Sequence, residues 1–151
     1  MSSRGTVRLE HPERCIGCYN CVFACSLELF GTISATRTAI SMKPCSPGDR
    51  FVVTFCSGCS DPPCVKVCEL KALQQDKDGK LKLVSECDKC ETFDCSKACI
   101  TDTLPIDART HKPILCTQCG KCAEVCPHEV ITYKETGNEQ ESRQSALHRL
   151  R

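Results

Sequence analysis

The sequence has no tryptophan, only two methionines, and seven phenylalanine and tyrosine residues together, so large core-filling side chains are scarce. Cysteine is counted among the 40% hydrophobic residues, and without it about 29% of the chain remains for an ordinary core. No run approaches the ~20 apolar residues needed to cross a bilayer. The charges nearly cancel, with 20 Lys and Arg against 19 Asp and Glu. These features exclude a membrane-embedded protein, a disordered chain and a globule held by apolar packing alone.

Cysteine, in contrast, is abundant, with 17 in 151 residues. A chain this rich in cysteine is either a disulfide-bonded secreted protein or a metal-binding intracellular one. Residues 1–8 are polar and lead to no apolar run of signal-peptide length, so we expect a cytoplasmic protein. In that reducing compartment the cysteines are expected to bind metal, and their odd number is then no obstacle.

All but one of the cysteines fall into four regularly spaced groups. The first and fourth groups have the spacing C-x2-C-x2-C-x3-C, and the second and third have C-x2-C-x4-C-x3-C, so the order of spacings is palindromic. The groups are, in chain order, Cys15, Cys18, Cys21 and Cys25; Cys56, Cys59, Cys64 and Cys68; Cys87, Cys90, Cys95 and Cys99; and Cys116, Cys119, Cys122 and Cys126.

The fourth group, with Pro127 directly after its last cysteine, matches the bacterial ferredoxin run. In that run the first three thiolates bind one 4Fe-4S cluster and the fourth binds another. A residue four positions on lies about one helical turn away, so the last cysteine faces a different cluster. Zinc ribbons do not add a third and fourth cysteine at these steps, and a disulfide framework predicts no such repeats. The four groups therefore predict four 4Fe-4S clusters.

The palindromic order predicts which cysteines share a cluster. A two-cluster ferredoxin is a pair of like motifs that exchange their fourth ligands, so groups with the same spacing should pair. The alternative pairs the first group with the second and the third with the fourth, and it would join groups of different spacing. The predicted ligand sets are quartet I (Cys15, Cys18, Cys21, Cys126), quartet II (Cys116, Cys119, Cys122, Cys25), quartet III (Cys56, Cys59, Cys64, Cys99) and quartet IV (Cys87, Cys90, Cys95, Cys68).

The predicted fold class is α+β, with two ferredoxin-like dicluster modules, the second inserted within the first, and with cluster-binding loops dominating. The outer module is expected over residues 1–50 and 105–134, the inserted module over 51–104, and a C-terminal tail over 135–151. Alternating residues and turn signals predict hairpins within 72–84, 104–115 and 39–55, and pairing of 6–9 with 130–133. Only brief helices are expected beside the cysteines.

Two features lie outside the four groups. Cys45 stands in a turn-rich segment without a partner at motif spacing, and a free thiol is the expected state. In the tail, Ala146, Leu147 and Leu150 could form one narrow apolar stripe on a short helix. A solvated extension is one interpretation of the tail, and docking on a catalytic partner or on a second copy of the chain is the other.

The bound clusters change the charge balance. The formal charge of +1 becomes about −7 once sixteen thiolates and four 4Fe-4S cores are counted. A nucleic-acid partner is therefore not expected. Cores that are fully ligated by cysteine leave no iron open to a substrate, which favours electron transfer over catalysis.

The groups resemble those of the four-cluster ferredoxin-type subunits of molybdenum and tungsten oxidoreductases and related hydrogenases. The resemblance is carried by Cys15-Ile16-Gly17-Cys18, Cys59-Ser60-Asp61-Pro62-Pro63-Cys64-Val65-Lys66-Val67-Cys68 and Cys126-Pro127. Within that family the chain looks most similar to the iron-sulfur subunit of bacterial tungsten-containing aldehyde oxidoreductases. The resemblance implies a tungsten- or molybdenum-pterin catalytic partner that oxidises aldehydes, and electron transfer through this chain to an FAD subunit or another acceptor.

Two alternatives remain open at this point. The chain could serve a formate dehydrogenase, a hydrogenase or a benzoyl-CoA reductase complex instead. It could also be a free polyferredoxin that diffuses between donors and acceptors. In each of these interpretations the chain transfers electrons and is not an enzyme on its own.

Overall fold

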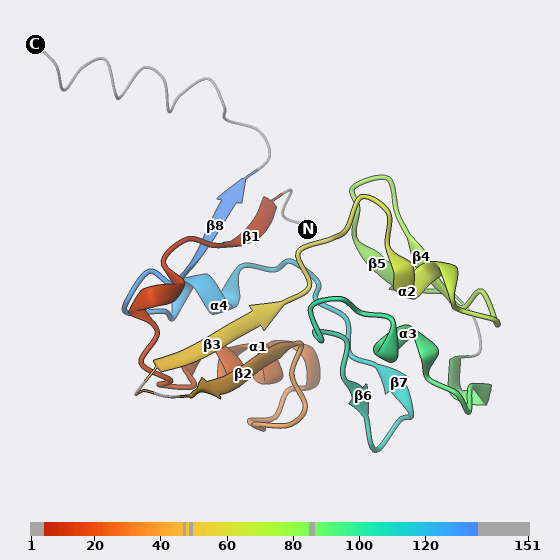
Figure 1. The fold of residues 1–151 in the computed structure, drawn as a ribbon, viewed down its shortest axis with the longest axis horizontal. Coiled ribbons are helices and arrows are strands. Elements are labelled where there is room, and N and C mark those ends of the chain that lie inside the picture. The colour runs from red at the N-terminus through yellow and green to blue at the C-terminus, as the bar shows by residue number, and fades with distance from the viewer. Residues whose placement is uncertain (1–4, 47, 49, 85–86, 136–151) are drawn as a thin grey trace, which may run out of the picture.

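The computed structural model describes residues 5–46, 48, 50–84 and 87–135. Within that part, helices and short strands are mixed, so the predicted combination of both is confirmed (Figure 1). The elements are β1 (Gly5–Leu9), α1 (Asn20–Phe30), β2 (Ile40–Cys45), β3 (Arg50–Phe55), α2 (Pro63–Lys66), β4 (Leu73–Gln75), β5 (Leu81–Leu83), α3 (Asp94–Lys97), β6 (Ile106–Asp107), β7 (Lys112–Pro113), α4 (Lys121–Glu124) and β8 (Ile131–Glu135), with 3-10 turns at Pro12–Arg14 and Cys87–Lys89.

The described strands form two-stranded antiparallel ribbons. Three ribbons are hairpins of consecutive strands, β2 with β3, β4 with β5 and β6 with β7. The fourth joins β1 to β8 and places Val7 opposite Tyr133. The three predicted hairpins and the pairing of residues 6–9 with 130–133 are confirmed. Residues near the two ends of the described chain therefore lie side by side (Figure 1).

A first core is built from both ends of the described chain and the middle hairpin. Its buried side chains come from β1, α1, β2, β3, α4 and β8. Each fully buried aliphatic side chain contributes roughly 1.5–3 kcal/mol relative to the exposed state. The buried members are Val7, Cys21, Val22, Ile40, Val53, Phe55, Cys122, Val130 and Ile131.

A second, smaller core lies in the other half of the molecule, among α2, α3 and β4–β7 (Figure 1). Only Cys64, Leu73, Cys95 and Leu104 are buried members, and two of these four are predicted ligands. So few apolar side chains cannot offset the conformational entropy of ordering this half. Metal binding is the additional source of stability that the sequence offers, because binding to ordered ligands contributes directly to folding.

One ion pair links the segment after α1 to β6. The Arg37 guanidinium donates from Nε to Asp107 Oδ1 at 3.1 Å and from a terminal nitrogen to Oδ2 at 2.8 Å. The Asp107 side chain is 2% exposed, and hydrogen bonds from Arg37, then the Arg109 backbone N–H and the Thr110 hydroxyl, lower its pKa to about 2. Arg37 also lies 4.1 Å over the ring of Phe30. This pair joins residues that are 70 positions apart.

Three local expectations are corrected. α1 extends over 11 residues, because no glycine or proline interrupts it before Gly31, which ends it at φ 67°. Of the fourth-position cysteines only Cys25 lies within a helix, and the other three follow the ends of α2, α3 and α4. Cys45 lies at the end of β2, opposite Arg50, rather than in the turn.

Two remaining expectations concern the membrane and the tail. Among the described residues, no helix reaches the length and hydrophobicity of a membrane span. The apolar stripe of Ala146, Leu147 and Leu150 lies outside the described residues.

Candidate metal centres

The predicted ligands surround four separate cavities. One cavity is lined by Cys15, Cys18, Cys21 and Cys126, together with apolar side chains that include Met42 and Ile131. The others are lined by Cys25, Cys116, Cys119 and Cys122, by Cys56, Cys59, Cys64 and Cys99, and by Cys68, Cys87, Cys90 and Cys95. Each cavity thus brings together the members of one quartet, and in each the fourth cysteine comes from a different group than the other three.

The acidities of the thiols show the same grouping. Burial raises the pKa of Cys21 and of Cys122 to about 12 and that of Cys64 to about 11, and it also raises the pKa of Cys95. Neighbouring thiols raise these values further, since like charges disfavour ionisation. The neighbours are Cys18, Cys126 and Cys15 for Cys21; Cys116, Cys25, Cys119 and then Cys21 for Cys122; Cys56, Cys99 and Cys59 for Cys64; and Cys87, Cys68 and Cys90 for Cys95.

The third cysteine of every group is therefore surrounded by the other three members of its quartet. With such pKa values the buried thiols keep their protons at neutral pH in the absence of metal. A bound iron must displace those protons, so metal binding strengthens as the pH rises.

Backbone conformation explains how the first two cysteines of a group face one cavity. In three groups the residue before the second cysteine has a positive φ: 72° at Gly17, 78° at Gly58 and 58° at Gln118. The backbone N–H groups of Gly58 and Gln118 donate to the sulfurs of Cys56 and Cys116. Loops with consecutive inward N–H groups are typical anion-binding concavities and occur at iron-sulfur sites.

Glycine is required at position 17 for two reasons. Its φ of 72° favours glycine, and a Cβ there would lie 2.4 Å from the ring of Phe51. The ring of this β3 residue thus closes over the loop between Cys15 and Cys18. The sequence shows the glycine but not the aromatic ring that requires it.

A second recurring turn follows the last cysteine in three groups. The residue three positions on has a positive φ, at Lys71, Asp102 and Glu129. Its backbone N–H donates to the carbonyl of the fourth cysteine, at 3.0 Å for Lys71 and 3.1 Å for Asp102. None of these residues is glycine, so the pattern was not evident from the sequence. In the first group α1 continues instead.

Quartets I, II and III are connected in series. Cys21 of quartet I lies close enough to Cys122 of quartet II to raise its pKa, and Cys56 of quartet III acts in the same way on the pKa of Cys116 of quartet II. Quartets III and IV share the second core through Cys64 and Cys95. The order in space is therefore I, II, III, IV.

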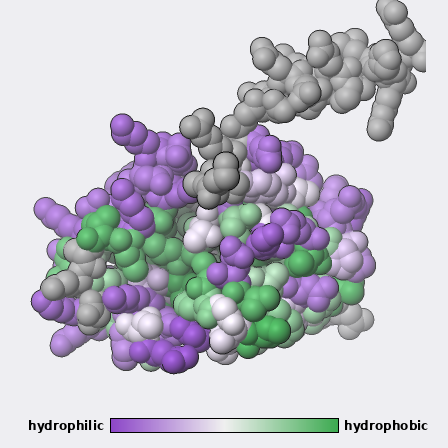
Figure 2. Space-filling model, turned by 180° about the vertical axis from the view of Figure 1, so that it is seen from behind, coloured by the Kyte–Doolittle hydropathy of each residue, from purple (hydrophilic) through white to green (hydrophobic). Residues whose placement is uncertain are grey.

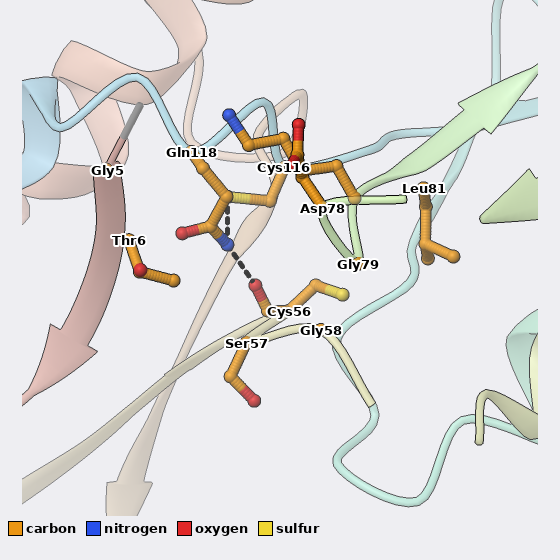
Figure 3. Close-up of a pocket in the computed structure, with 11 residues that line it drawn as sticks. Gly5, Thr6, Cys56, Ser57, Gly58, Asp78, Gly79, Leu81, Cys116 and Gln118 are labelled. Atoms are coloured by element: carbon orange, nitrogen blue, oxygen red, sulfur yellow. Dashed lines mark hydrogen bonds between the residues drawn. The ribbon is translucent and has the colours of Figure 1, made fainter. Parts of the chain in front are cut away.

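Gln118 bridges the interval between quartets II and III (Figure 3). Its side-chain nitrogen donates to the carbonyl of Cys56 at 2.7 Å and to the sulfur of Cys116 at 3.6 Å. Its side-chain oxygen accepts the backbone N–H of Val7 at 2.7 Å. Gln118, Cys56 and Cys116 border a cavity of about 660 Å³ that Gly79 also lines. Sequence reasoning missed Gln118, whose position inside a C-x2-C loop was the only available signal.

The chemistry of the donor sets fits iron-sulfur clusters. Among the described residues, no three His, Cys, Asp or Glu side chains converge as a single metal ion requires. The thiols of the first, second and fourth groups form no disulfide with one another. Four sulfur donors around a cavity are the ligand set of a cubic iron-sulfur cluster. The fold and these sites define an iron-sulfur protein of the ferredoxin type.

Comparison with known proteins supports this class. A family model described as "4Fe-4S binding domain" matches residues 112–132, which contain the fourth group. The polyferredoxin-like subunit of an aliphatic sulfonate oxidoreductase from Pyrococcus furiosus is 36% identical over 122 residues, which are 78% of this chain and 69% of that protein. The beta subunit of an NADH-dependent phenylglyoxylate dehydrogenase from Aromatoleum evansii is 30% identical over 84% of this chain and 30% of its own length.

Two further similarities were found. One subunit of a tetrathionate reductase from Salmonella typhimurium is 32% identical over 71% of this chain and 45% of that protein. A solved complex of benzoyl coenzyme A reductase shares 16% identity over 97% of this chain and 88% of that one, with a TM-score of 0.47, a likeness too weak to support an argument.

This chain belongs to the polyferredoxin-like iron-sulfur electron-transfer subunits of oxidoreductases. The chain spans less than half of the length of two of these relatives, the phenylglyoxylate dehydrogenase subunit and the tetrathionate reductase subunit.

Proposed function

We propose that the chain carries electrons through four 4Fe-4S clusters, bound by quartets I to IV, between a catalytic oxidoreductase subunit and a second redox partner. The observation that carries this proposal is that the four cysteines of each quartet line one cavity. Each cluster supplies a site that gains and loses one electron. The chain itself catalyses no substrate reaction.

The residues of this chain bind, separate and shield the four centres. The first core and second core bury the third cysteine of each group, which limits water around each centre. The close approach of Cys21 to Cys122, and of Cys56 to Cys116, keeps successive centres near one another. This proximity of ligand residues supports electron transfer along the order I, II, III, IV.

In the proposed organisation, quartets I and II belong to an outer module and quartets III and IV to a module inserted within it. β1, α1, α4 and β8 support quartets I and II, and α2 and α3 support quartets III and IV. We infer that the inserted module begins after β3, because Val53 and Phe55 belong to the first core. We infer that it continues to about residue 115, because Leu104 lies in the second core with Leu115 packed against it.

The proposed catalytic partner is a tungsten- or molybdenum-pterin subunit that oxidises aldehydes, and the proposed acceptor is an FAD subunit. The relatives that are named as subunits of oxidoreductases support a catalytic partner of this general kind. Formate dehydrogenase, hydrogenase and benzoyl-CoA reductase complexes are the alternative partners. A free polyferredoxin is the alternative without a tight partner.

Anaerobic purification at native abundance tests both parts of the proposal. We expect about sixteen irons and sixteen acid-labile sulfides per chain, together with a copurifying subunit that contains tungsten or molybdenum. Recombinant chain alone should turn over no aldehyde and should accept electrons once that subunit and an aldehyde are added. Stoichiometric zinc without inorganic sulfide would refute the clusters. A pure monomer with full iron and no partner would refute only the complex.

A further inference from the structure

The sulfur of Cys99, a member of quartet III, lies within hydrogen-bond distance of three groups on two threonines. The backbone N–H of Thr103 lies 3.4 Å from it and the Thr103 hydroxyl 3.5 Å. The Thr101 hydroxyl lies at 3.6 Å. The two hydroxyl oxygens are 2.9 Å apart. If one hydroxyl donates to the other, the second still has its hydrogen available for a deprotonated sulfur.

The equivalent positions of the repeated group carry no hydroxyl. The second and third groups have identical cysteine spacing, yet Cys68 is followed two and four residues on by Leu70 and Ala72, where Cys99 is followed by Thr101 and Thr103. In the fourth group the corresponding residues are His128 and Val130. The hydroxyl pair is therefore specific to the centre at quartet III.

The two threonines place their donors at one corner of the site. Hydrogen bonds to a thiolate sulfur stabilise its negative charge, so Thr101 and Thr103 favour negative charge at this corner.

Exposure to water also favours negative charge at quartet III. Cys59 is exposed, whereas every member of quartets II and IV is buried or half-buried. Quartet I also has an exposed member, Cys18, but no side-chain donor to its sulfurs appears among the described hydrogen bonds. Cys90 of quartet IV has one hydroxyl beside its sulfur, that of Thr92. Among the residues that the structure describes, quartet III alone combines an exposed ligand with two neighbouring hydroxyls.

We propose that Thr101 and Thr103 raise the reduction potential of the centre at quartet III above those of the other three, so that this centre takes the first electron. The inference rests on the proposed function. Reduction adds one negative charge to a thiolate-ligated cluster, and hydrogen bonds to the sulfurs and contact with water favour that added charge. The electron comes from the catalytic partner, and no proton is transferred.

This placement has a functional consequence, because quartet III is an interior member of the series. An electron that enters at either end of the chain comes to rest between quartets II and IV. A catalytic partner that releases two electrons per turnover can then deliver the first to quartet III and the second to the centres around it. The threonines act as positioning residues, since they touch a ligand sulfur and not a substrate.

A potentiometric titration of the full-length holoprotein, followed by electron paramagnetic resonance, tests the assignment. At the potential where the first-reduced signal of the natural protein is half developed, the double variant Thr101→Val and Thr103→Val should show an at least tenfold lower ratio of reduced to oxidised centre. A tenfold change equals about 59 mV for a one-electron couple. Each single variant should show a smaller shift, and Thr103→Ser, which keeps the hydroxyl, should restore the natural value.

Two further variants identify the centre and serve as controls. Cys59→Ser should alter the spectrum of the first-reduced centre, because serine replaces one of its ligands. Thr54→Val, on β3, should leave all potentials unchanged, and Leu70→Thr should raise the potential of the centre at quartet IV. Full iron content with an unshifted first signal in the double variant, or a first signal that Cys59→Ser does not alter, would overturn the inference. A low iron and sulfide content of the natural protein would instead refute the proposed function.

Discussion

Cys21 and Cys25 lie one turn apart on α1, yet they border different cavities. Cys21 is buried among the members of quartet I, whereas Cys25 lies beside Cys116 and Cys122 of quartet II. A helical step of four residues advances about 6 Å along the axis, so two adjacent centres can take ligands from one short segment. The exchange of ligands between groups follows from this geometry.

The exchange predicts which ligand variants behave alike. Cys25→Ser and Cys116→Ser should perturb the same centre, because both border the cavity of quartet II, and Cys15→Ser and Cys126→Ser should share another. Mössbauer spectra of anaerobic samples enriched in ⁵⁷Fe separate the centres. Identical spectral changes in Cys25→Ser and Cys15→Ser would contradict the assignment.

Gln118 gives a second prediction for a single residue. Gln118→Met keeps a side chain of similar length but leaves the buried N–H of Val7 without its acceptor, a loss that typically costs ~1–3 kcal/mol. We expect a lower temperature for loss of cluster absorbance under anaerobic heating. Gln74→Met is the matched control, since Gln74 is exposed on β4 and its amide donates only at 3.5 Å to Lys71. Equal melting temperatures in the two variants would show that the bridge contributes no stability.

At the scale of the elements, helix length differs among the four groups for reasons that are local. α4 is followed closely by Pro127, which cannot continue a helix, whereas Pro62 and Pro63 set where α2 begins. The residues of α1 contain neither proline nor glycine, and the helix continues through its fourth cysteine. The first group therefore presents its last ligand on a helix and the others present theirs on the turn that follows.

Some elements of this fold have local signals in the sequence, and others do not. Hairpins were evident because alternation of side chains and a Gly-containing turn are local signals, as in residues 72–84. The quartets could be proposed because cysteine spacing repeats. The ion pair of Arg37 with Asp107 was not evident, since nothing in the sequence relates two residues 70 positions apart. The turns at Lys71, Asp102 and Glu129 were missed because their positive φ occurs at residues other than glycine.

The ion pair predicts a stability effect with a defined pH dependence. Asp107→Asn should lower the temperature of anaerobic unfolding, because the Arg37 guanidinium loses its carboxylate. The folded-state pKa lies below the ordinary value of 3.8, at about 2, so the contribution is present above pH ~4 and is lost as the pH falls toward 2. The difference between natural protein and variant should therefore stay constant from pH 6 to pH 8.

The matched control for this pair is Asp61→Asn, which removes an exposed ion pair with Lys66. Exposed pairs contribute little, because water screens both charges. Calorimetry at pH 6, 7 and 8 measures both variants. The decrease in unfolding temperature could disappear between pH 6 and 8, or it could be equally large in Asp61→Asn. Either result would contradict the prediction that the ion pair of Arg37 and Asp107 stabilises the contact between the two halves.

At the scale of the whole molecule, hydrophobic and hydrophilic side chains alternate in patches over the surface (Figure 2). Exposed apolar residues lie beside ligands near both ends of the series, with Ile16 between two members of quartet I and Val67 next to Cys68 of quartet IV. Metal binding, rather than apolar burial, must hold a chain with this distribution together. The two halves differ in this respect, because the first core has nine buried members and the second has four.

This difference predicts how the molecule responds to loss of iron. Anaerobic treatment with a strong chelator under reducing conditions should first unfold the half that contains α2, α3 and β4–β7, because the four thiol ligands of each centre there surround a cavity with little apolar packing of its own. Amide hydrogen exchange measures this directly: Leu73 and Leu104, almost fully buried in the native chain, should exchange at the rate of unfolded peptide. Val7 and Ile131 lie on the paired strands β1 and β8, opposite Tyr133 and Leu9. They should keep part of their protection, since nine buried side chains support that ribbon. Equal loss of protection at Leu73 and Ile131 at every stage of iron removal would show that the two halves unfold as one cooperative unit.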